Sequence, residues 1–162
     1  MGDADLAWLD GDGTGLDDLA VIWATVDLER VLRDLGLEPT LAAATVDDPL
    51  LGGRVLDLVD PAPETAVGAV VGLAGARRIA LAEPSTEGRL AAFLARHGEG
   101  PAGRYVGVAL DLGALATRAA TAGIAISRPE IGPFGPAVIV LGGRLGSPHL
   151  VLVEVAAVPS RP

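Results

Sequence analysis

Short apolar runs alternate along this chain with turns that are rich in glycine, proline and aspartate. A continuous apolar run of four to eight residues predicts a buried strand, and apolar residues at three- and four-residue spacing predict a helix. The runs that we interpret as strands are 19–24, 40–46, 53–59, 65–73, 77–82, 104–110, 124–127, 137–141 and 150–156. The segments with helical spacing are 27–36, 85–98 and 111–123.

Each predicted helix has a residue that can cap its N-terminus and a glycine after its last apolar position. Aspartate, serine and threonine side chains accept hydrogen bonds from the first free N–H groups of a helix, and glycine is favoured just beyond its C-terminus. The expected caps are Asp27, Ser85 or Thr86, and Asp111, and the expected stops are Gly36, Gly98 and Gly123. These signals set the helix boundaries given above.

The order of elements occurs twice. In each half a strand precedes Asp-Leu, a helix, a glycine with an aliphatic residue, and then about three strands, as at Asp27-Leu28 and Asp111-Leu112. This βαβββ order predicts an α+β fold of two tandem modules, because one such module leaves a face of its sheet uncovered. The chain then divides into an N-terminal extension (1–15), a first module (16–84), a linking helix (85–98), a second module (99–158) and a tail (159–162).

Composition and charge narrow the possible partners. Half of the 162 residues are hydrophobic and 20% are charged, so the chain can build a core. The net charge is -9 and no lysine is present, so the long-range field repels phosphate backbones and we expect no nucleic-acid partner. The absence of cysteine excludes thiolate nucleophiles and cysteine-based zinc sites. The acidic start lacks the basic region of a signal peptide, and the longest apolar run, 66–76, is too short to span a bilayer. We therefore expect a cytoplasmic protein without a membrane partner.

The acidic stretch Asp10-Gly11-Asp12-Gly13-Thr14 has three possible interpretations. It resembles the phosphatase motif of the haloacid dehalogenase superfamily, but that fold needs alternating strands and helices and a basic residue that is usually lysine. It also resembles a calcium loop, but Val21 stands where an EF-hand places its bidentate glutamate. The third interpretation, which we favour, is a turn in front of the first strand, with Trp8 packed on the fold or at a dimer edge.

Three segments resemble one known superfamily in their order. The segments 16–37, 79–112 and 149–155, with Glu83-Pro84 after a strand and "GEG" (98–100) before the next, resemble the vicinal oxygen chelate superfamily. Within it they are most similar to the methylmalonyl-CoA epimerase family. The resemblance implies that the two modules curl a mixed sheet into a half-barrel with a cavity, that the substrate is a small molecule, and that the protein is a homodimer.

The resemblance also implies a metal site that this chain has lost. The superfamily holds a divalent metal with two histidines, a glutamine or glutamate, and a glutamate. The matching positions are Asp18, Ala80, Arg104 (or Tyr105 after a one-residue shift) and Glu154, and of these only Glu154 is conserved in type. Alanine has no donor atom and arginine stays protonated, so we expect no metal and no cofactor. The family's second catalytic carboxylate falls within 38–76, where no equivalent glutamate is evident.

The expected chemistry is metal-independent proton transfer. We expect Asp18, Arg104 and Glu154 to point into the cavity together, with Glu154 as the base and Arg104 stabilising an enolate oxyanion. Asp18 would be a second acid or base, and Tyr105 a reserve donor. The hypothesis is an isomerase, epimerase or cyclase that acts on a carbonyl compound, either an acyl-CoA or a polyketide-like molecule.

Several other residues are candidates for binding the substrate, and other functions stay open. Ala80, Trp23, Phe134 and His149 are expected at the pocket, where the proline- and glycine-rich loop 128–136 is either a lid or a simple connection. Arg77 and Arg78 either contact a CoA phosphate or lie on a solvated strand edge. One alternative is that Asp18, Arg104 and Glu154 only neutralise one another as a buried ion triad in an inactive site. A second alternative is a non-catalytic protein that binds an antibiotic or polyketide. Another is a metal-dependent epimerase or glyoxalase that uses Asp18, Glu154 and His149.

Overall fold

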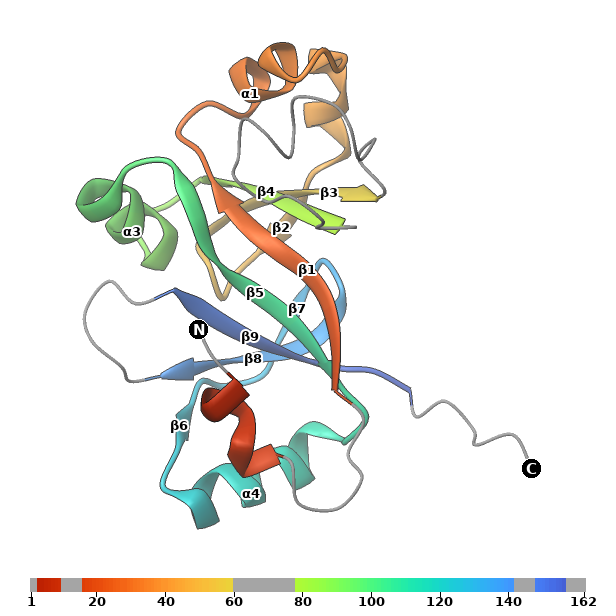
Figure 1. Cartoon of the computed structure of the whole chain (residues 1–162), viewed down its shortest axis with the longest axis vertical. Coiled ribbons are helices and arrows are strands. Elements are labelled where there is room, and N and C mark those ends of the chain that lie inside the picture. The colour runs from red at the N-terminus through yellow and green to blue at the C-terminus, as the bar shows by residue number, and fades with distance from the viewer. Residues whose placement is uncertain (1–2, 10–15, 60–77, 142–147, 157–162) are drawn as a thin grey trace.

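Two long strands, β1 (Leu16–Ala24) and β5 (Gly100–Val108), run antiparallel through the middle of the molecule and join its two halves (Figure 1). The computed structural model describes residues 3–9, 16–59, 78–141 and 148–156. Strand β1 also pairs in parallel with β4 (Arg78–Pro84), and β5 pairs in parallel with β9 (His149–Glu154). Each half therefore joins its first strand to its last, as the repeated order of elements in the sequence implies.

The remaining strands extend the sheet in the same way on both sides. Strand β3 (Gly53–Val59) pairs antiparallel with β4, and β8 (Gly135–Leu141) pairs antiparallel with β9. The short strands are β2 (Val46–Asp48), β6 (Ala125–Ile126) and β7 (Glu130–Gly132), and the order is β2-β3-β4-β1-β5-β9-β8-β6, with β7 on β8. Strands β2 and β7 contact each other although they belong to opposite ends of this sheet. The sheet is thus curled into a half-barrel, and the predicted α+β fold is confirmed.

Side chains alternate across the sheet and separate an inner face from an outer face. The inner face carries a cluster that includes Ala20, Ile22, Ala24, Val55, Ala80, Ala82, Tyr105, Ala137, Ile139, Val151 and Val153. Helix α3 (Arg89–His97) packs against this cluster through Leu90, Phe93 and Leu94. Small side chains dominate the central strands, so the two sides of the curled sheet can approach closely.

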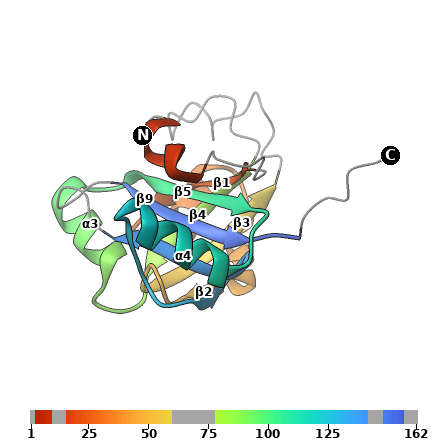
Figure 2. The same ribbon diagram turned by 90° about the horizontal axis from the view of Figure 1, so that it is seen from below.

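Helices cover the outer face of each half. Helix α1 (Leu28–Asp34) packs on β4 and β3 through a cluster with Trp23, Leu32 and Leu81, and helix α4 (Leu112–Ala122) packs Leu115 against Leu152. Figure 2 shows α4 lying across the strands of the second half. The N-terminal 3-10 helix η1 (Asp3–Leu9) joins the α4 side, where Leu6 and Leu9 are buried and Trp8 is partly buried. Leucine side chains therefore anchor residues 3–9 of the predicted N-terminal extension to the second half.

The predicted helix signals are largely confirmed. The Asp27 and Asp111 side chains accept hydrogen bonds from the Arg30 and Ala114 amides, at 3.0 and 2.9 Å. Gly98 and Gly123 stand at the C-termini of α3 and α4 with φ of 75° and 72°. The middle helix differs: it begins at Arg89 after Gly88 and has no side-chain cap. Ser85 and Thr86 instead donate their amides to the carbonyl of Gly52, which ties this segment to the β2–β3 turn.

Three predicted strand boundaries are corrected by the structure. Residues 40–46 are mostly a 3-10 helix, η2 (Pro39–Ala44), because proline begins the segment and alanines follow it, and only Val46 joins the sheet. Strand β5 begins at Gly100, within the predicted loop, because it pairs there with β1. The predicted loop 128–136 contains β7 and the turn into β8. The predicted strand 65–73 and the acidic stretch 10–14 lie outside the described residues.

No helix among the described residues is long and apolar enough to cross a membrane.

Replacing Gly103 with alanine should disrupt the junction of β5 with β9. A Cβ atom at Gly103 would lie 1.9 Å from the carbonyl oxygen of His149, and its φ is +144°. We expect Gly103→Ala to lower the free energy of unfolding by roughly 3 kcal/mol or more. The matched control is Gly123→Ala, which has φ of +72° but open space around its Cβ and should cost about 1–2 kcal/mol. Urea unfolding measures both, and equal losses would contradict the packing argument.

Candidate functional site

The predicted pair Asp18 and Arg104 lies on the outer face of the sheet. Asp18 stands opposite Val106, and Arg104 stands beside Leu150, and both of these partners pack under α4. A register shift between Asp18 and Ala20 turns the strand, so Ala20 faces inward and Asp18 does not. The prediction that both residues point into the cavity is therefore wrong.

The contact between Asp18 and Arg104 is a surface ion pair. The Arg104 Nη1 atom lies 3.3 Å from Asp18 Oδ1, and the Asp18 side chain is 78% exposed. The Arg104 Nε and Nη2 atoms are buried and have no hydrogen-bond partner among the described residues. Only the Asp18 side of this pair is exposed, because the Arg104 side chain is 21% exposed.

Glu154, the predicted base, caps a helix. Its Oε2 atom accepts a hydrogen bond from the Leu112 amide at 3.0 Å, at the first residue of α4. The first half repeats this contact, because Glu83 near the end of β4 accepts a hydrogen bond from the Leu28 amide at 2.6 Å. The inward residues of β9 are Val151 and Val153, so Glu154 faces outward. The prediction that Glu154 points into the cavity is therefore wrong, because its neighbour Val153 takes the inward position on β9.

The inner face holds a different polar pair, Tyr105 and Asp48. The Tyr105 hydroxyl donates a hydrogen bond to Asp48 Oδ2 at 2.5 Å, and the other carboxyl oxygen accepts one from the Leu50 amide at 2.9 Å. Both side chains are 1% exposed. Tyr105 is thus the reserve donor that does lie on the inner face, at the position reached by the one-residue shift.

Burial changes the acidity of both groups. Desolvation raises the pKa of Asp48 above its ordinary value, against the opposing effect of its hydrogen bonds. Burial, together with the nearby Asp48 charge, also raises the pKa of Tyr105. Tyr105 therefore stays protonated as a donor at neutral pH, and Asp48 is a stronger base than an exposed aspartate.

Phe134 covers this pair and connects it to a charged pair at the edge of the inner face. The Phe134 ring lies edge-on to the Tyr105 ring with centroids 4.8 Å apart, and the Arg78 guanidinium carbon lies 4.7 Å from the centroid of Phe134. Arg78 donates to both carboxyl oxygens of Asp57, at 2.7 and 2.5 Å. We name Asp48, Asp57, Arg78, Tyr105 and Phe134 the inner site.

The turn between β7 and β8 closes the inner site. A Cβ atom at Gly132, the last residue of β7, would lie 3.7 Å from the Asp48 carboxyl group. Phe134 follows two residues later, so the backbone of one turn covers Asp48 while its side chain covers Tyr105. The segment that we considered as a lid from the sequence is therefore a folded hairpin in contact with the site.

The other predicted binding residues are scattered. Ala80 is on the inner face opposite Asp57, but Trp23 is on the outer face with α1, where it is core and not pocket wall. His149 lies by α3, its ring centroid 6.0 Å from that of Phe93. Burial lowers the pKa of His149, and its Nε2 atom has no partner among the described residues.

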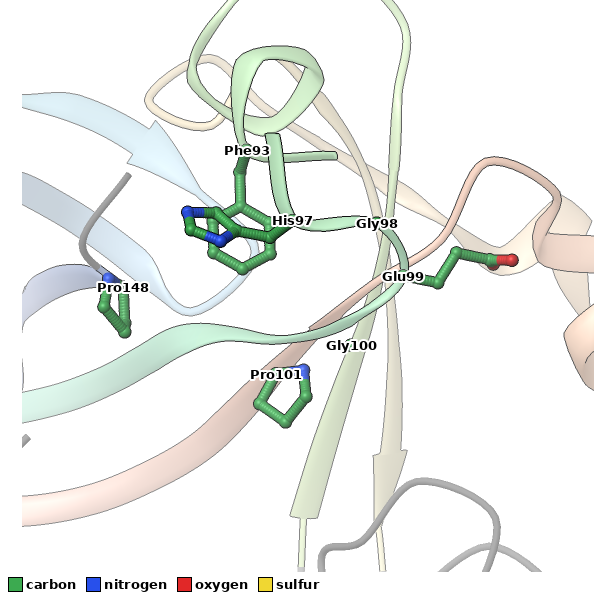
Figure 3. A pocket seen from close by; sticks show the side chains of 7 residues that line it. All are labelled: Phe93, His97, Gly98, Glu99, Gly100, Pro101 and Pro148. Carbon is green, nitrogen blue, oxygen red and sulfur yellow. The ribbon is translucent and has the colours of Figure 1, made fainter. Parts of the chain in front are cut away.

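A shallow hollow of about 330 Å³ lies at the C-terminus of α3 (Figure 3). Its lining residues are Phe93, His97, Gly98, Glu99, Gly100, Pro101 and Pro148. The Glu99 carboxylate points away from the two rings and binds Arg30. The hollow thus offers mainly apolar surface, and none of the inner-site residues lines it.

The donor set does not fit the divalent metal that the fold implies. Most inward positions on the four central strands carry alanine, isoleucine, valine or tyrosine side chains, which lack the imidazole and carboxylate donors that such metals need. Arg78 and His149, which are exceptions, stand at the first residues of β4 and β9. Within 3–9, 16–59, 78–141 and 148–156, no three or more His, Asp or Glu side chains group together as metal ligands. The proposed alternative set of Asp18, Glu154 and His149 is among the sets that this excludes.

Sequence reasoning missed two members of the inner site, Asp48 and Asp57, and named Arg78 only as a contact for a CoA phosphate or as a residue of a solvated strand edge. Asp48, Asp57 and Arg78 lie on strands that were predicted in part, but their faces depend on the register. Asp57 alternates with Val55, and Arg78 with Ala80, so a strand-by-strand assignment of inward positions would have placed them. Asp48 stands within 38–76, where the resemblance implied a catalytic carboxylate.

Comparison with solved structures supports the fold. A variant of Streptomyces coelicolor methylmalonyl-CoA epimerase, in complex with 2-nitronate-propionyl-CoA, is 22% identical, with a TM-score of 0.61 over 90% of this chain and 98% of that chain. The Mycobacterium tuberculosis methylmalonyl-CoA epimerase is 21% identical, with a TM-score of 0.61 over 93% and 96%. A hypothetical protein from Bacillus halodurans C-125 is 17% identical, with a TM-score of 0.57 over 91% and 99%. The chain therefore has the vicinal oxygen chelate fold of these structures.

No protein-family model and no curated protein sequence matches the chain.

Removing the Glu154 carboxyl should weaken α4 and leave the inner site intact. We expect Glu154→Ala to lower the free energy of unfolding by about 1 kcal/mol, because the Leu112 amide loses its acceptor. Glu154→Gln keeps an acceptor oxygen and should cost less. Urea unfolding measures both, and an unchanged stability in Glu154→Ala would contradict the capping role.

Burial of Asp48 should make stability depend on pH. Its folded pKa lies above the ordinary value of 3.8, so the folded state binds the extra proton between these two values. This contribution to stability is complete below pH 3.8 and is lost as the pH rises through the raised folded pKa. Urea unfolding across pH 3.5–8 should show this loss in the wild type and a flatter profile in Asp48→Asn. A profile that Asp48→Asn leaves unchanged would contradict the assignment.

Proposed function

We propose that this protein is a proton-transfer enzyme of the isomerase or epimerase type that acts on a small carbonyl compound without a metal. One observation supports it most: the Tyr105 hydroxyl is bonded to Asp48 on an inner face whose central strands otherwise present aliphatic side chains. Among the described buried residues, only Thr25 and Asp48 are classed as polar or charged. Strongly buried polar pairs with raised pKa values are typical of functional sites.

The two groups have complementary roles in enolisation. In the proposed step the Tyr105 hydroxyl turns away from Asp48 and donates its single hydrogen to the substrate carbonyl oxygen, which becomes the enolate oxygen. Asp48, as carboxylate and no longer bonded to that hydroxyl, takes the proton from the carbon next to the carbonyl. Asp48 then returns the proton to a different carbon of the conjugated enolate, which isomerises the substrate, because return to the original carbon from the same side would only regenerate it. The raised pKa of Asp48 favours proton removal, and the raised pKa of Tyr105 keeps its hydroxyl a donor.

The similar structures suggest the class of substrate. Methylmalonyl-CoA epimerases with this fold are seen in complex with methylmalonyl-CoA and with 2-nitronate-propionyl-CoA, which are CoA esters. Thioesters and ketones both form an enolate when they lose a proton from the carbon next to the carbonyl, so the same stabilisation serves either type of substrate. The proposal assigns no step to Asp18, Arg104 or Glu154.

A second function is favoured by the burial of the pair. Because Tyr105 and Asp48 are each 1% exposed, a substrate reaches them only when the β7–β8 turn moves aside. A protein that never opens this turn would use the pair only to order the inner face, and would be a non-catalytic binding protein. The following experiment separates the two functions.

Exchange of carbon-bound hydrogen tests the enzyme directly. In D2O we expect the protein to replace the proton next to the carbonyl of methylmalonyl-CoA or of phenylacetone, as followed by proton NMR. Asp48→Asn should reduce the exchange rate by about 100-fold or more because the base is lost, and Tyr105→Phe by about 100-fold because the oxyanion donor is lost. EDTA should leave the rate unchanged.

The matched control is Asp18→Asn, which makes the same change on an exposed aspartate of the outer face and should keep the full exchange rate. Three results would contradict the proposal: no exchange with either compound, equal rates in Asp48→Asn and Asp18→Asn, or loss of exchange after EDTA.

A further inference from the structure

The Phe134 ring lies in the inner site where a ligand would have to lie to reach Tyr105. It contacts the Tyr105 ring on one side of the site and the Arg78 guanidinium at the site's edge. Edge-to-face ring contacts and cation–π contacts both depend on a flat aromatic partner. The Phe134 ring therefore fills the space between Arg78 and Tyr105, and both of its contacts are ones that another planar ring can make.

We propose that this space is a ring-binding subsite, that Phe134 occupies it in the absence of substrate, and that the substrate is an uncharged carbonyl compound carrying an aromatic or unsaturated ring. This inference rests on the proposed proton transfer and names its substrate class. It differs from the ligands of the similar structures, which are CoA esters.

The charges at the subsite favour an uncharged ring. Both carboxyl oxygens of Asp57 accept hydrogen bonds from Arg78, so the cation is already paired within the protein. What Arg78 offers to the subsite is the face of its guanidinium, which attracts the electron-rich face of a ring. An anionic ligand would gain little from this paired cation and would lie near the Asp48 carboxyl group, so we expect it to bind less well.

A substrate ring bound in place of the Phe134 ring would bring the substrate's carbonyl group close to Tyr105 and Asp48. The centroids of the Phe134 and Tyr105 rings are 4.8 Å apart, and the Tyr105 hydroxyl already donates to Asp48. A ring in this subsite lies beside the Tyr105–Asp48 pair, so a carbonyl group attached to it has the Tyr105 hydroxyl as its nearby donor once that hydroxyl turns from Asp48. Ring binding and enolate stabilisation would then use adjacent parts of one site.

Phe134 lies in the two-residue turn of the β7–β8 hairpin. Gly132 and Gly135 flank the Pro133-Phe134 pair, and Gly135 has φ of +115°, which residues with a side chain rarely adopt. Phe134 itself is only partly buried, in contrast to Tyr105 and Asp48. The proposal therefore needs a change in this one short turn, and in no other element, to take the ring out of the subsite.

Emptying the subsite tests the inference by binding and not by activity. In Phe134→Ala we expect acetophenone to raise the melting temperature by several degrees and to shift NMR signals of residues around Tyr105. The wild type should show at least 10-fold weaker binding, because Phe134 competes for the space. Benzoate, a charged ligand of similar size, should bind Phe134→Ala at least 10-fold more weakly than acetophenone.

Further variants separate the contacts. When Tyr105→Phe is added to Phe134→Ala, the binding of acetophenone should weaken, but the binding of toluene, which has no carbonyl, should not. When Arg78→Gln is added to Phe134→Ala, the binding of both ligands should weaken. The matched control is Ile131→Ala, which removes a side chain that is 69% exposed on the same hairpin and should gain no binding. If Phe134→Ala does not fold, Phe134→Val opens a smaller part of the same space and is compared in the same way.

Each outcome decides between the proposals. Equal binding by Phe134→Ala and the wild type, or benzoate bound as tightly as acetophenone, would overturn the ring subsite. Acetophenone binding in Phe134→Ala without any hydrogen exchange in the wild type would support the subsite and overturn the enzymatic function. Exchange of methylmalonyl-CoA by a wild type whose Phe134→Ala variant binds no ring would do the opposite.

Discussion

The antiparallel pairing of β1 with β5 is the constraint on which the rest of the structure depends. It joins two halves, each of which has an incomplete sheet, into one curled sheet with a continuous inner face. Because side chains alternate along a strand, the register of this pairing decides which residues face inward on both central strands. The shift between Asp18 and Ala20 sends one aspartate to the surface and places Ala20 opposite Tyr105.

The two halves are stabilised by the same local contacts. An aspartate caps each main helix, and a glutamate near the end of the last strand binds the first amide of that helix. These contacts explain why Asp-Leu and a late glutamate occur in each half of the sequence. They also show that Glu154, which matches a metal ligand of the superfamily by type, has a structural partner within its own half.

The inner face of this chain differs chemically from a metal site. Aliphatic side chains cover the central strands, and one phenol–carboxyl pair remains among them. A buried carboxyl group is costly unless it is hydrogen-bonded, and here a hydroxyl and a backbone amide satisfy both oxygens. The burial that makes the pair energetically costly also raises the pKa values of Asp48 and Tyr105. For this reason the pair is the best candidate for proton transfer among the described residues.

The sequence by itself determined the class of fold, the repeated order of elements and most helix ends. These features follow from local causes: apolar spacing, aspartate caps at Asp27 and Asp111, and glycine stops such as Gly98. The sequence also named Tyr105 and Phe134 as candidate site residues, but it did not predict the hollow by α3, the hairpin over Asp48, or Asp48 and Asp57 as members of the inner site.

Only the tertiary structure decided which polar residues meet, because a shift of one residue in strand register moves a side chain to the opposite face. Asp48, Arg78 and Tyr105 lie far apart in the sequence and come together only through β2, β4 and β5 of the curled sheet. Asp18, Arg104 and Glu154 carry side chains of equally suitable chemistry, but these side chains face outward. Residue type alone makes the inward and the outward residues equally good candidates for a site, and only the strand register shows which of them face the interior.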